Sequence, residues 1–368
     1  MKPYTLQTPR KIIFGRGTSA DAAKHITALG TQIALIHGAN PRRAQWLIDA
    51  LHAEGAHVHA LPCPSEPTLE MLQGALETLR PKNIQTVVGL GGGAPLDLAK
   101  ALAALIPSRS DPLDHLEVVG LGLPLTANPL PFIALPTTAG TGAEATKNAV
   151  IGVPDQGRKV SLRDDRMLAT LALVDPALTD NCPKAITLAS GLDAITQVIE
   201  PYLSSKATPL TDALCKPAIP LGLDALKTLM HQEDPDARDA LAHVALTSGI
   251  ALANSGLGAI HGLAGVIGGL APAPHGAVCG ALLAPVLKAN AEVLPDNAKI
   301  AEVQASIANT LGDLPAFTKT HGLPTLQTMG VDPIQHAAIA EAAAASSSMK
   351  GNPTPLSQTK LLACLNAA

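Results

Sequence analysis

Apolar and polar positions follow two different rhythms along the first half of the chain. Short runs of Val, Ile, Leu and Ala predict buried strands at residues 31–38, 56–61, 84–93 and 131–138. Segments with apolar residues at helical spacing lie among them, at 41–55, 66–81 and 94–105. Strands and helices that alternate through short links predict a parallel sheet covered by helices on both faces.

The pattern changes after about Pro176, where strand signals stop and long Ala- and Leu-rich segments begin. These segments predict helices at 184–204, 208–231, 236–255, 273–293, 297–311 and 333–348. We therefore expect an α/β domain over residues 1–177, followed by an all-helical domain over residues 178–368.

Composition narrows the class of protein. The chain has 368 residues, of which 47% are hydrophobic and 15% charged, so it can bury enough apolar surface to fold. A formal charge of −4 offers no basic face for nucleic acid. Five widely spaced cysteines without a CxxC pair argue against a disulfide scaffold and against a zinc ribbon.

The sequence also bears on location. Residues 1–15 lack the apolar segment of a secretory signal. Residues 249–272 are apolar but are interrupted by polar residues and glycines, which favours a buried helix pair over a membrane span. We therefore expect a cytoplasmic protein with free thiols that acts on a small molecule and has neither nucleic-acid nor membrane partners.

The segment 87–101 carries the sharpest local signal for a ligand. A predicted strand delivers Gly91, Gly92 and Gly93 to the start of a helix. Without Cβ atoms, an anion can approach the backbone closely, and the helix N-terminus offers free N–H groups that suit a pyrophosphate. The alternative is a tight strand-to-helix turn that binds no ligand.

A second candidate is the loop at residues 134–147, which also follows a predicted strand and holds Thr137, Thr138 and Thr141. Hydroxyl groups beside glycines can hold a ribose or an amide. The alternative is a capping loop, because Thr141 and Glu144 have the spacing of a capping box.

Polar residues in the helical half form a third candidate. Asp193 and Gln197 lie four residues apart on one face of a predicted helix, and His261 and His275 follow in glycine-rich stretches of low charge. A carboxylate with two imidazoles is a donor set for a divalent metal. Each residue alone has another explanation, as a satisfied histidine, a first-turn charge or a surface amide. An uncompensated polar group would be costly in such apolar stretches.

Together these features resemble the iron-containing (group III) alcohol dehydrogenase family. The matching segments are IIFGRG (12–17), GLGGGAPLDLAKA (89–101), PTTAGTGAEAT (136–146), LVDPALT (173–179), GLDAITQVIEPY (191–202), NSGLGAIHGLAG (254–265), PHGAVCGALL (274–283) and GNPTPLS (351–357). The resemblance implies a dinucleotide-binding α/β domain, a helical domain and an active site in the cleft between them, in an architecture shared with dehydroquinate synthase. It also implies hydride transfer between NAD(P) and a small alcohol or aldehyde, commonly in a homodimer.

The resemblance assigns roles by motif. The cofactor residues would be Gly38, Asn40, Gly91, Gly92, Gly93, Asp97, Thr137, Thr138 and Thr141, with Gly91–Gly93 and Asp97 at the phosphates and the threonines at the nicotinamide. The metal ligands would be Asp193, Gln197, His261 and His275, around Fe²⁺ or Zn²⁺. The metal would polarise the substrate oxygen, and no separate catalytic acid or base is assigned.

Two departures from the family's pattern concern the metal. Gln197 stands where the family has a histidine ligand, and an amide oxygen binds first-row metals more weakly than imidazole does. Gly265 stands where the family often has another histidine, which leaves the proton relay unassigned. Two alternatives stay open: a metal-independent reductase similar to maleylacetate reductases, and a nucleotide-binding relative with impaired catalysis.

A lyase similar to dehydroquinate synthase is a third alternative. It would need Lys and Arg to hold a phosphate and a carboxylate, but from residue 181 onward the sequence has a single arginine, Arg238. The helical half therefore favours a small, weakly charged substrate.

A further departure concerns the coenzyme. The first predicted strand ends at residues 37–40 without the Asp that many relatives use to bind the ribose 2′-hydroxyl, and Arg42 and Arg43 follow. A missing carboxylate beside guanidinium groups favours NADP over NAD. The alternative is that these arginines are solvated surface charges.

Overall fold

The computed structural model describes residues 3–368, which form two compact units. The sheet unit comprises Gln7–Thr138 and Ala143–Thr179. The helical unit comprises residues 3–6, Ala139–Gly142 and Asp180–Ala368. The chain thus enters the helical unit after Thr179, close to the boundary expected after residue 177. The short segment 139–142 belongs with the helices, although the sequence analysis placed it in the first domain.

The sheet unit is built on a six-stranded sheet in which every neighbouring pair is parallel. Its strands, in spatial order, are β1 (Ile12–Phe14), β8 (Leu171–Val174), β5 (Phe132–Pro136), β4 (Thr86–Gly91), β2 (Gln32–His37) and β3 (His57–Pro62). The four predicted strands and the parallel sheet are confirmed. The pattern does not predict β1 and β8, because such short runs carry too little periodicity.

The direction in which successive strands are added to the sheet reverses between β2 and β4. Counting β2, β3, β4, β5 and β8 as strands one to five gives the order 2-1-3-4-5, as in flavodoxin-like sheets. Ligands of open α/β sheets bind outside the carboxyl ends of the strands at such a reversal. Gly38 follows β2 there, and the glycine turn follows β4 on the neighbouring strand.

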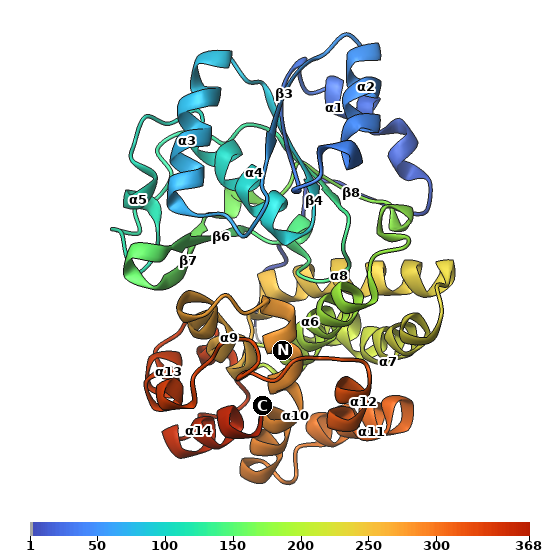
Figure 1. Cartoon of the computed structure of the whole chain (residues 1–368), viewed down its shortest axis with the longest axis vertical. Helices are drawn as coiled ribbons and strands as arrows, with labels where there is room; N and C mark the ends of the chain where they lie inside the picture. The colour runs from blue at the N-terminus through green and yellow to red at the C-terminus, as the bar shows by residue number, and fades with distance from the viewer. Residues whose placement is uncertain (1–2) are drawn as a thin grey trace. The chain divides into compact units, whose positions relative to one another are not determined.

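Helices cover both faces of this sheet (Figure 1). They are α1 (Ala22–Thr27), α2 (Gln45–Ala53), α3 (Leu69–Leu79), α4 (Gly93–Leu105) and the short α5 (Pro112–His115). Along β2, Ile33 and Leu35 pack with α1 and α2, whereas Ala34 and Ile36 pack with α3 and α4. Burial on both faces explains why the central strands are continuous apolar runs.

An antiparallel hairpin of β6 (Asn148–Val153) and β7 (Arg158–Arg163) lies outside the main sheet, and the hydrophobic pattern does not predict it. Ala149 and Ile151 join the core that α4 forms with the sheet. The backbone N–H of Val150 donates to the carboxylate of Asp97 on α4 at 3.0 Å. The hairpin therefore holds the helix that begins at the glycine turn.

The helical unit is organised around α6, which packs against α7, α8 and α10. Its helices are α6 (Lys184–Leu203), α7 (Pro209–His231), α8 (Pro235–Ser255), α9 (Ala259–Leu270), α10 (His275–Val293), α11 (Ala298–Leu311), α12 (Leu314–Thr320), α13 (His336–Ala344) and α14 (Gln358–Ala367). The expected change to an all-helical second half is confirmed, and α12 and α14 add to the predicted helices.

The apolar stretch 249–272 forms parts of two helices, as expected, and α8 and α9 meet at a bend of 98°. By length and composition alone this bent pair, or α10, could cross a membrane. More than half of α10 (56%) is buried inside the protein, however, as in the core helix of a globular unit.

Candidate functional site

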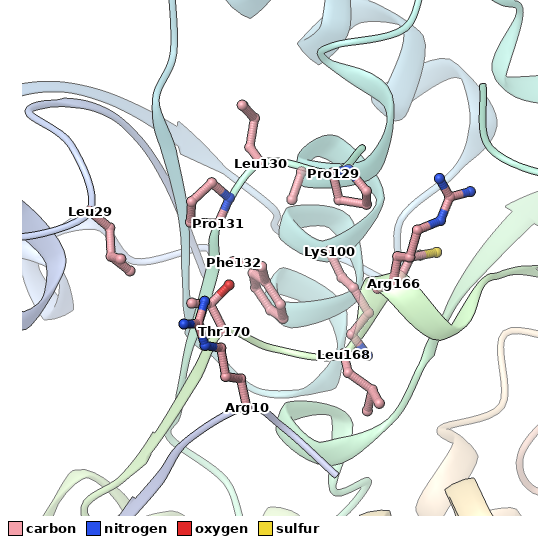
Figure 2. Close-up of a pocket in the computed structure, with 12 residues that line it drawn as sticks. Arg10, Leu29, Lys100, Pro129, Leu130, Pro131, Phe132, Arg166, Leu168 and Thr170 are labelled. Carbon is pink, nitrogen blue, oxygen red and sulfur yellow. The ribbon is translucent and has the colours of Figure 1, made fainter. Parts of the chain in front are cut away.

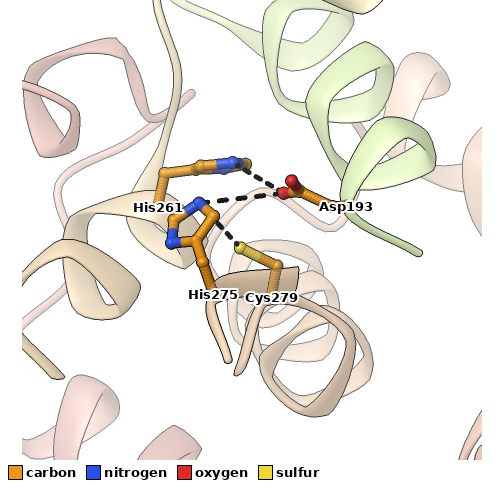
Figure 3. Close-up of side chains that lie close together, drawn as sticks. All are labelled: Asp193, His261, His275 and Cys279. Atoms are coloured by element: carbon orange, nitrogen blue, oxygen red, sulfur yellow. Dashed lines mark hydrogen bonds and ion pairs between the residues drawn. The ribbon is translucent and has the colours of Figure 1, made fainter. Parts of the chain in front are cut away.

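Four potential metal ligands from three helices lie close together in the helical unit (Figure 3). They are Asp193 on α6, His261 on α9, and His275 and Cys279 on α10, and one donor atom from each lies within 4.8 Å of the others. Nε2 of His261 lies 3.4 Å from Oδ1 of Asp193. Nε2 of His275 lies 3.8 Å from the same oxygen and 3.7 Å from Sγ of Cys279. The structure thus brings together three of the four predicted ligands.

Close packing of α10 on α6 makes this convergence possible. A Cβ atom on Gly276 would lie 2.4 Å from the carbonyl oxygen of Ala189, and one on Gly280 would lie 2.6 Å from Cδ1 of Leu192. Both neighbours belong to α6. At Gly276 the neighbour is backbone, so only glycine there lets the helices approach this closely, whereas a side chain at position 280 would require Leu192 to move. His275 opens α10, and Cys279 follows one turn later on the same face.

Two polar atoms of the cluster are buried without a hydrogen-bond partner among the residues that the structure describes. They are Oδ1 of Asp193 and Nε2 of His261, and both face the centre of the cluster. Burying such atoms without a partner is costly, so native proteins rarely do so. A divalent cation at the centre would satisfy both atoms, and the residues present therefore fit the metal that the resemblance implies.

Glu200, also on α6, orients one of the ligands. Its Oε2 lies 2.6 Å from Nδ1 of His261, and its Oε1 accepts the N–H of Ile260 at 2.7 Å. A carboxylate acceptor favours the tautomer with a proton on Nδ1, which leaves the lone pair of Nε2 directed at the cluster. This arrangement is the usual support of a histidine that binds a metal.

The electrostatics of the cluster favour a cation. The negative charge of Cys279 raises the pKa of His275 to about 9 against the effect of burial. Burial lowers the pKa of His261, but the charges of Cys279 and Glu200 outweigh it and raise that pKa well above its ordinary value. Burial raises the pKa of Asp193, but the two imidazoles outweigh it and lower that pKa. Protons or a metal ion can supply the positive charge that the site stabilises.

The side-chain amide of Gln197 forms hydrogen bonds within the helical unit. Its Nε2 donates to the carbonyl oxygen of Thr141 at 2.7 Å and to Oγ of Ser248 at 2.9 Å. The Thr141 carbonyl can only accept, and the Ser248 hydroxyl already donates to the carbonyl of Ala245, so the amide nitrogen must face them. Gln197 therefore ties α6 to α8 and to the segment 139–142.

That segment is held on the helices by glycines. Gly142 has a φ of +60°, and a Cβ atom on Gly249 of α8 would lie 2.1 Å from the carbonyl oxygen of Gly142. Thr141 accordingly lies in the helical unit, whereas Thr137 and Thr138 lie in the sheet unit. The three threonines predicted to line the nicotinamide are thus divided between the units.

The glycine turn has the geometry of an anion site. Gly92 caps α4, which begins at Gly93 without a side-chain cap. A Cβ atom on Gly91 would lie 2.6 Å from Cγ of Pro95, and one on Gly92 would lie 3.1 Å from Oγ1 of Thr138. Side chains at these positions would crowd the turn, and their absence leaves the N–H groups of the first helical turn accessible to a ligand.

Asp97 was expected at the cofactor phosphates, but its carboxylate contacts other residues of the sheet unit. Its carboxylate accepts the N–H of Val150 and lies 3.7 Å from Nζ of Lys100. Lys100 is fully buried and also donates to Oγ1 of Thr146 and the carbonyl of Asn148, at 2.7 and 2.8 Å. These contacts make Asp97 and Lys100 the link between α4 and the β6–β7 hairpin.

The end of β2 carries the other predicted cofactor residues. Gly38 has open space around the position of a Cβ atom. Oδ1 of Asn40 accepts the N–H of Arg42 at 3.1 Å and caps a short 3-10 turn at Pro41–Arg43. Arg42 and Arg43 are exposed at the surface, in the immediate vicinity of Gly38 in the chain.

A pocket of about 250 Å³ lies in the sheet unit at the opposite end of the strands (Figure 2). Phe132, at the start of β5, and Thr170, just before β8, help to line it with Lys100 and Arg166. Arg166 is engaged with Asp164 and with the carbonyl of Leu125. The amino ends of parallel strands are not where open α/β sheets bind dinucleotides, so this pocket is separate from the glycine turn.

Cys279 and Glu200 were not among the site residues predicted from the sequence. Cys279 lies four residues after His275, the same spacing that singled out Asp193 and Gln197. Glu200 follows Gln197 by three residues, on the same face of α6. Helical spacing could have suggested both residues, but their contacts with α9 and α6 depend on packing between distant segments.

A parallel sheet with a glycine turn at its reversal point, joined to a helical unit with a metal-binding cluster, defines a class of dinucleotide-dependent oxidoreductases with a metal centre. Residues 9–176 match the family model of iron-containing alcohol dehydrogenases, and residues 187–368 match the C-terminal model of the same family. The chain therefore belongs to the iron-containing alcohol dehydrogenase family. It is an oxidoreductase that acts on alcohols and aldehydes.

Individual relatives agree with this assignment. Alcohol dehydrogenase 4 of Schizosaccharomyces pombe is 32% identical over 298 residues, covering 79% of this chain and 69% of that protein. The NAD-dependent methanol dehydrogenase of Bacillus methanolicus is 29% identical over 339 residues, covering 86% of this chain and 87% of that protein. The crystal structure of a 1,3-propanediol oxidoreductase is similar with a TM-score of 0.88 at 25% identity, over 99% of each chain.

Proposed function

We propose that this protein is a metal-dependent alcohol dehydrogenase that interconverts small, weakly charged alcohols and aldehydes and prefers NADP(H). The observation that carries the metal dependence is a pair of buried atoms that make no hydrogen bond, Oδ1 of Asp193 and Nε2 of His261, which lie 3.4 Å apart beside His275. Two proteins similar to this chain are a methanol dehydrogenase and a 1,3-propanediol oxidoreductase. The short alcohols in their names favour a short aliphatic substrate.

The two units have different tasks in this proposal. The glycine turn and the N–H groups at the start of α4 bind the cofactor phosphates, and the nicotinamide supplies the hydride acceptor or donor. Asp193, His261 and His275 would hold a divalent ion, which would supply Lewis acidity toward the substrate oxygen. Glu200 keeps the proton of His261 on Nδ1, so that Nε2 stays available as a donor to the metal.

The helical unit supports a weakly charged substrate. Arg238, its only arginine from residue 181 on, is buried and engaged with Glu233, Thr187 and the carbonyl of Cys182. It is therefore committed to the fold and does not provide a phosphate or carboxylate site. This supports a dehydrogenase over a lyase similar to dehydroquinate synthase.

Activity with a loaded metal tests the central proposal. Protein freed of metal and then loaded with Fe²⁺ or Zn²⁺ should reduce short aldehydes with NADPH, and chelation should abolish turnover while NADPH still binds. Asp193→Asn should lose both bound metal and turnover, whereas Asp224→Asn, an exposed position on α7, should change neither. Turnover that survives complete metal removal would support the metal-independent reductase instead. Cofactor binding without turnover under any condition would support the impaired relative.

The coenzyme preference rests on the end of β2. Gly38 offers no carboxylate to repel a 2′-phosphate, and Arg42 and Arg43 lie close by in the chain. Gly38→Asp fits the open space and should lower the ratio of kcat/KM for NADPH to that for NADH by at least about tenfold, the effect of roughly 1.4 kcal/mol. The matched control is Gly38→Asn, which adds similar bulk without charge and should change the ratio far less. A wild-type preference for NADH would overturn this part.

We also propose a homodimer in the cytoplasm. The cysteines support a reducing compartment, since no disulfide links any of the five in the structure of residues 3–368. Two-fold symmetry is the commonest arrangement of homo-oligomers. Light scattering of the purified protein tests the dimer, and fractionation of the source cells tests the location. A monomer, or recovery outside the cytoplasm, would contradict these two points.

A further inference from the structure

We propose that Cys279 is a fourth metal ligand through its Sγ atom, so that the centre has one carboxylate, two imidazoles and one thiolate. This inference rests on the proposed metal site and adds a ligand that the resemblance does not supply. In the family pattern the fourth position belongs to a histidine, where this chain has Gln197. The thiol proton passes to solvent when the sulfur–metal bond forms.

Distances within the cluster fit a single ion. Bond lengths of 2.0–2.3 Å and tetrahedral angles place N and O donors roughly 3.3 Å apart, and place S about 3.6 Å from N. The observed separations are 3.4 Å between His261 and Asp193, 3.8 Å between His275 and Asp193, and 3.7 Å between His275 and Sγ of Cys279. The remaining pairs of donor atoms lie within 4.8 Å of one another, so adjustments of the side chains would place all four donors around one centre.

Gln197 gives a second reason for a replacement ligand. Its amide nitrogen is held by the carbonyl of Thr141 and by Ser248, so the side chain serves the contact of α6 with α8 and the segment 139–142. A neutral amide oxygen would in any case be a weaker donor than imidazole. Cys279, on the adjacent helix α10, supplies a strong donor that is negatively charged as a thiolate.

The surroundings of Cys279 differ from those of two other buried thiols, Cys63 and Cys364. Sγ of Cys63 donates to the carbonyl of Ser65, and Sγ of Cys364 donates to the carbonyl of Pro285, so each has a neutral backbone partner. Cys279 instead lies against the imidazole of His275 and beside Asp193, at the buried face where Gly276 and Gly280 bring α10 onto α6. Its position is that of a ligand rather than of an apolar core residue.

A thiolate among the donors changes the preferred metal. Sulfur ligands select softer ions, and a four-donor site with nitrogen and sulfur suits Zn²⁺ better than Mg²⁺ or Mn²⁺. Zn²⁺ also lies above Fe²⁺ in the general order of affinities for such donors. We therefore expect this member of an iron-containing family to retain zinc in preference to iron.

Cobalt provides a direct test, because Co²⁺ bound to a thiolate has a near-ultraviolet charge-transfer band as well as visible d–d bands. The wild-type protein should bind one Co²⁺ per chain with both sets of bands. Cys279→Ser should keep the visible bands, lose the charge-transfer band and bind Zn²⁺ at least about tenfold more weakly. The control, Cys215→Ser, alters a buried thiol of α7 outside the cluster and should leave the spectrum unchanged.

A second measurement needs no variant. X-ray absorption of the zinc-loaded wild-type protein should show one sulfur at about 2.3 Å among lighter ligands. A Co²⁺ spectrum without the charge-transfer band, a band that survives in Cys279→Ser, or a zinc shell without sulfur would overturn the role of Cys279 and leave the metal site intact. If the wild-type protein binds neither ion, or binds them unchanged in Asp193→Asn, the proposed metal site itself fails.

Discussion

The carboxylate of Glu200 accepts two hydrogen bonds from the first turn of α9, one from Nδ1 of His261 at 2.6 Å and one from the N–H of Ile260 at 2.7 Å. One side chain therefore caps the helix and sets the tautomer of a histidine of the candidate metal site. Each bond uses a different oxygen of Glu200, Oε2 for His261 and Oε1 for Ile260. This double use links the stability of the helix start to the chemistry of the site.

Glu200→Gln should consequently weaken metal binding. An amide has only one acceptor oxygen, so either His261 or Ile260 loses its partner. We expect a metal affinity roughly 10–100-fold lower, measured by competition with a chelator of known affinity. Glu292→Gln, at an exposed position on α10, is the control and should have no effect. Unchanged affinity in Glu200→Gln would show that the carboxylate does not orient His261.

Lys100→Met should destabilise the sheet unit. Methionine has a similar shape but removes the cation beside Asp97 and the donor to Thr146 and to the carbonyl of Asn148. Breaking a buried pair from one side costs about 3 kcal/mol or more, which lowers the unfolding midpoint by roughly 6–12 °C. Adding Asp97→Asn should restore part of this loss, because it removes the uncompensated charge. A double variant that is less stable than the single one would contradict this account.

Glu144 should make stability depend on pH. Burial raises its pKa from 4.5 to about 7, so between these values the unfolded chain releases a proton that the folded chain keeps. Stability must therefore fall as the pH rises through this range, by roughly 3 kcal/mol at most. Glu144→Gln cannot ionise, so its midpoint relative to the wild type should rise between pH 5 and pH 8. Glu77→Gln, exposed on α3, should show no such trend.

Gly249→Ala and Gly74→Ala should have opposite effects, although both glycines lie inside helices. Alanine is the better helix former by roughly 0.8–1 kcal/mol, and at Gly74 a Cβ atom meets open space, so Gly74→Ala should stabilise the protein. At Gly249 the new atom would lie 2.1 Å from the carbonyl of Gly142, and the displacement should cost about 1–3 kcal/mol or more. Denaturant unfolding of both variants measures the difference. Equal stabilities would contradict the close contact.

The local sequence was sufficient where short-range physics decides the structure. Burial on both faces makes β2, β4 and β5 continuous apolar runs, and the glycines after β4 coincide with the start of α4. The change from strands to helices near Thr179 is equally visible, because periodicity is a property of neighbouring residues. The hairpin of β6 and β7 was not predicted because β6 carries the apolar Val150 on its exposed face, which hides the alternation, and the polar and apolar alternation of β7 spans only six residues.

The composition of the metal cluster was decided by tertiary structure. The sequence pointed to Asp193, Gln197, His261 and His275, whereas the helical spacing of Cys279 and Glu200 is only a local hint that does not by itself place them at the cluster. Their roles arise because α10 packs on α6 and α9 packs on α10, which brings these polar atoms into one small volume where Asp193, His261 and Cys279 are buried. The charged groups of the cluster come together only where segments more than sixty residues apart in the chain make contact. A pattern of neighbouring residues cannot predict such a contact.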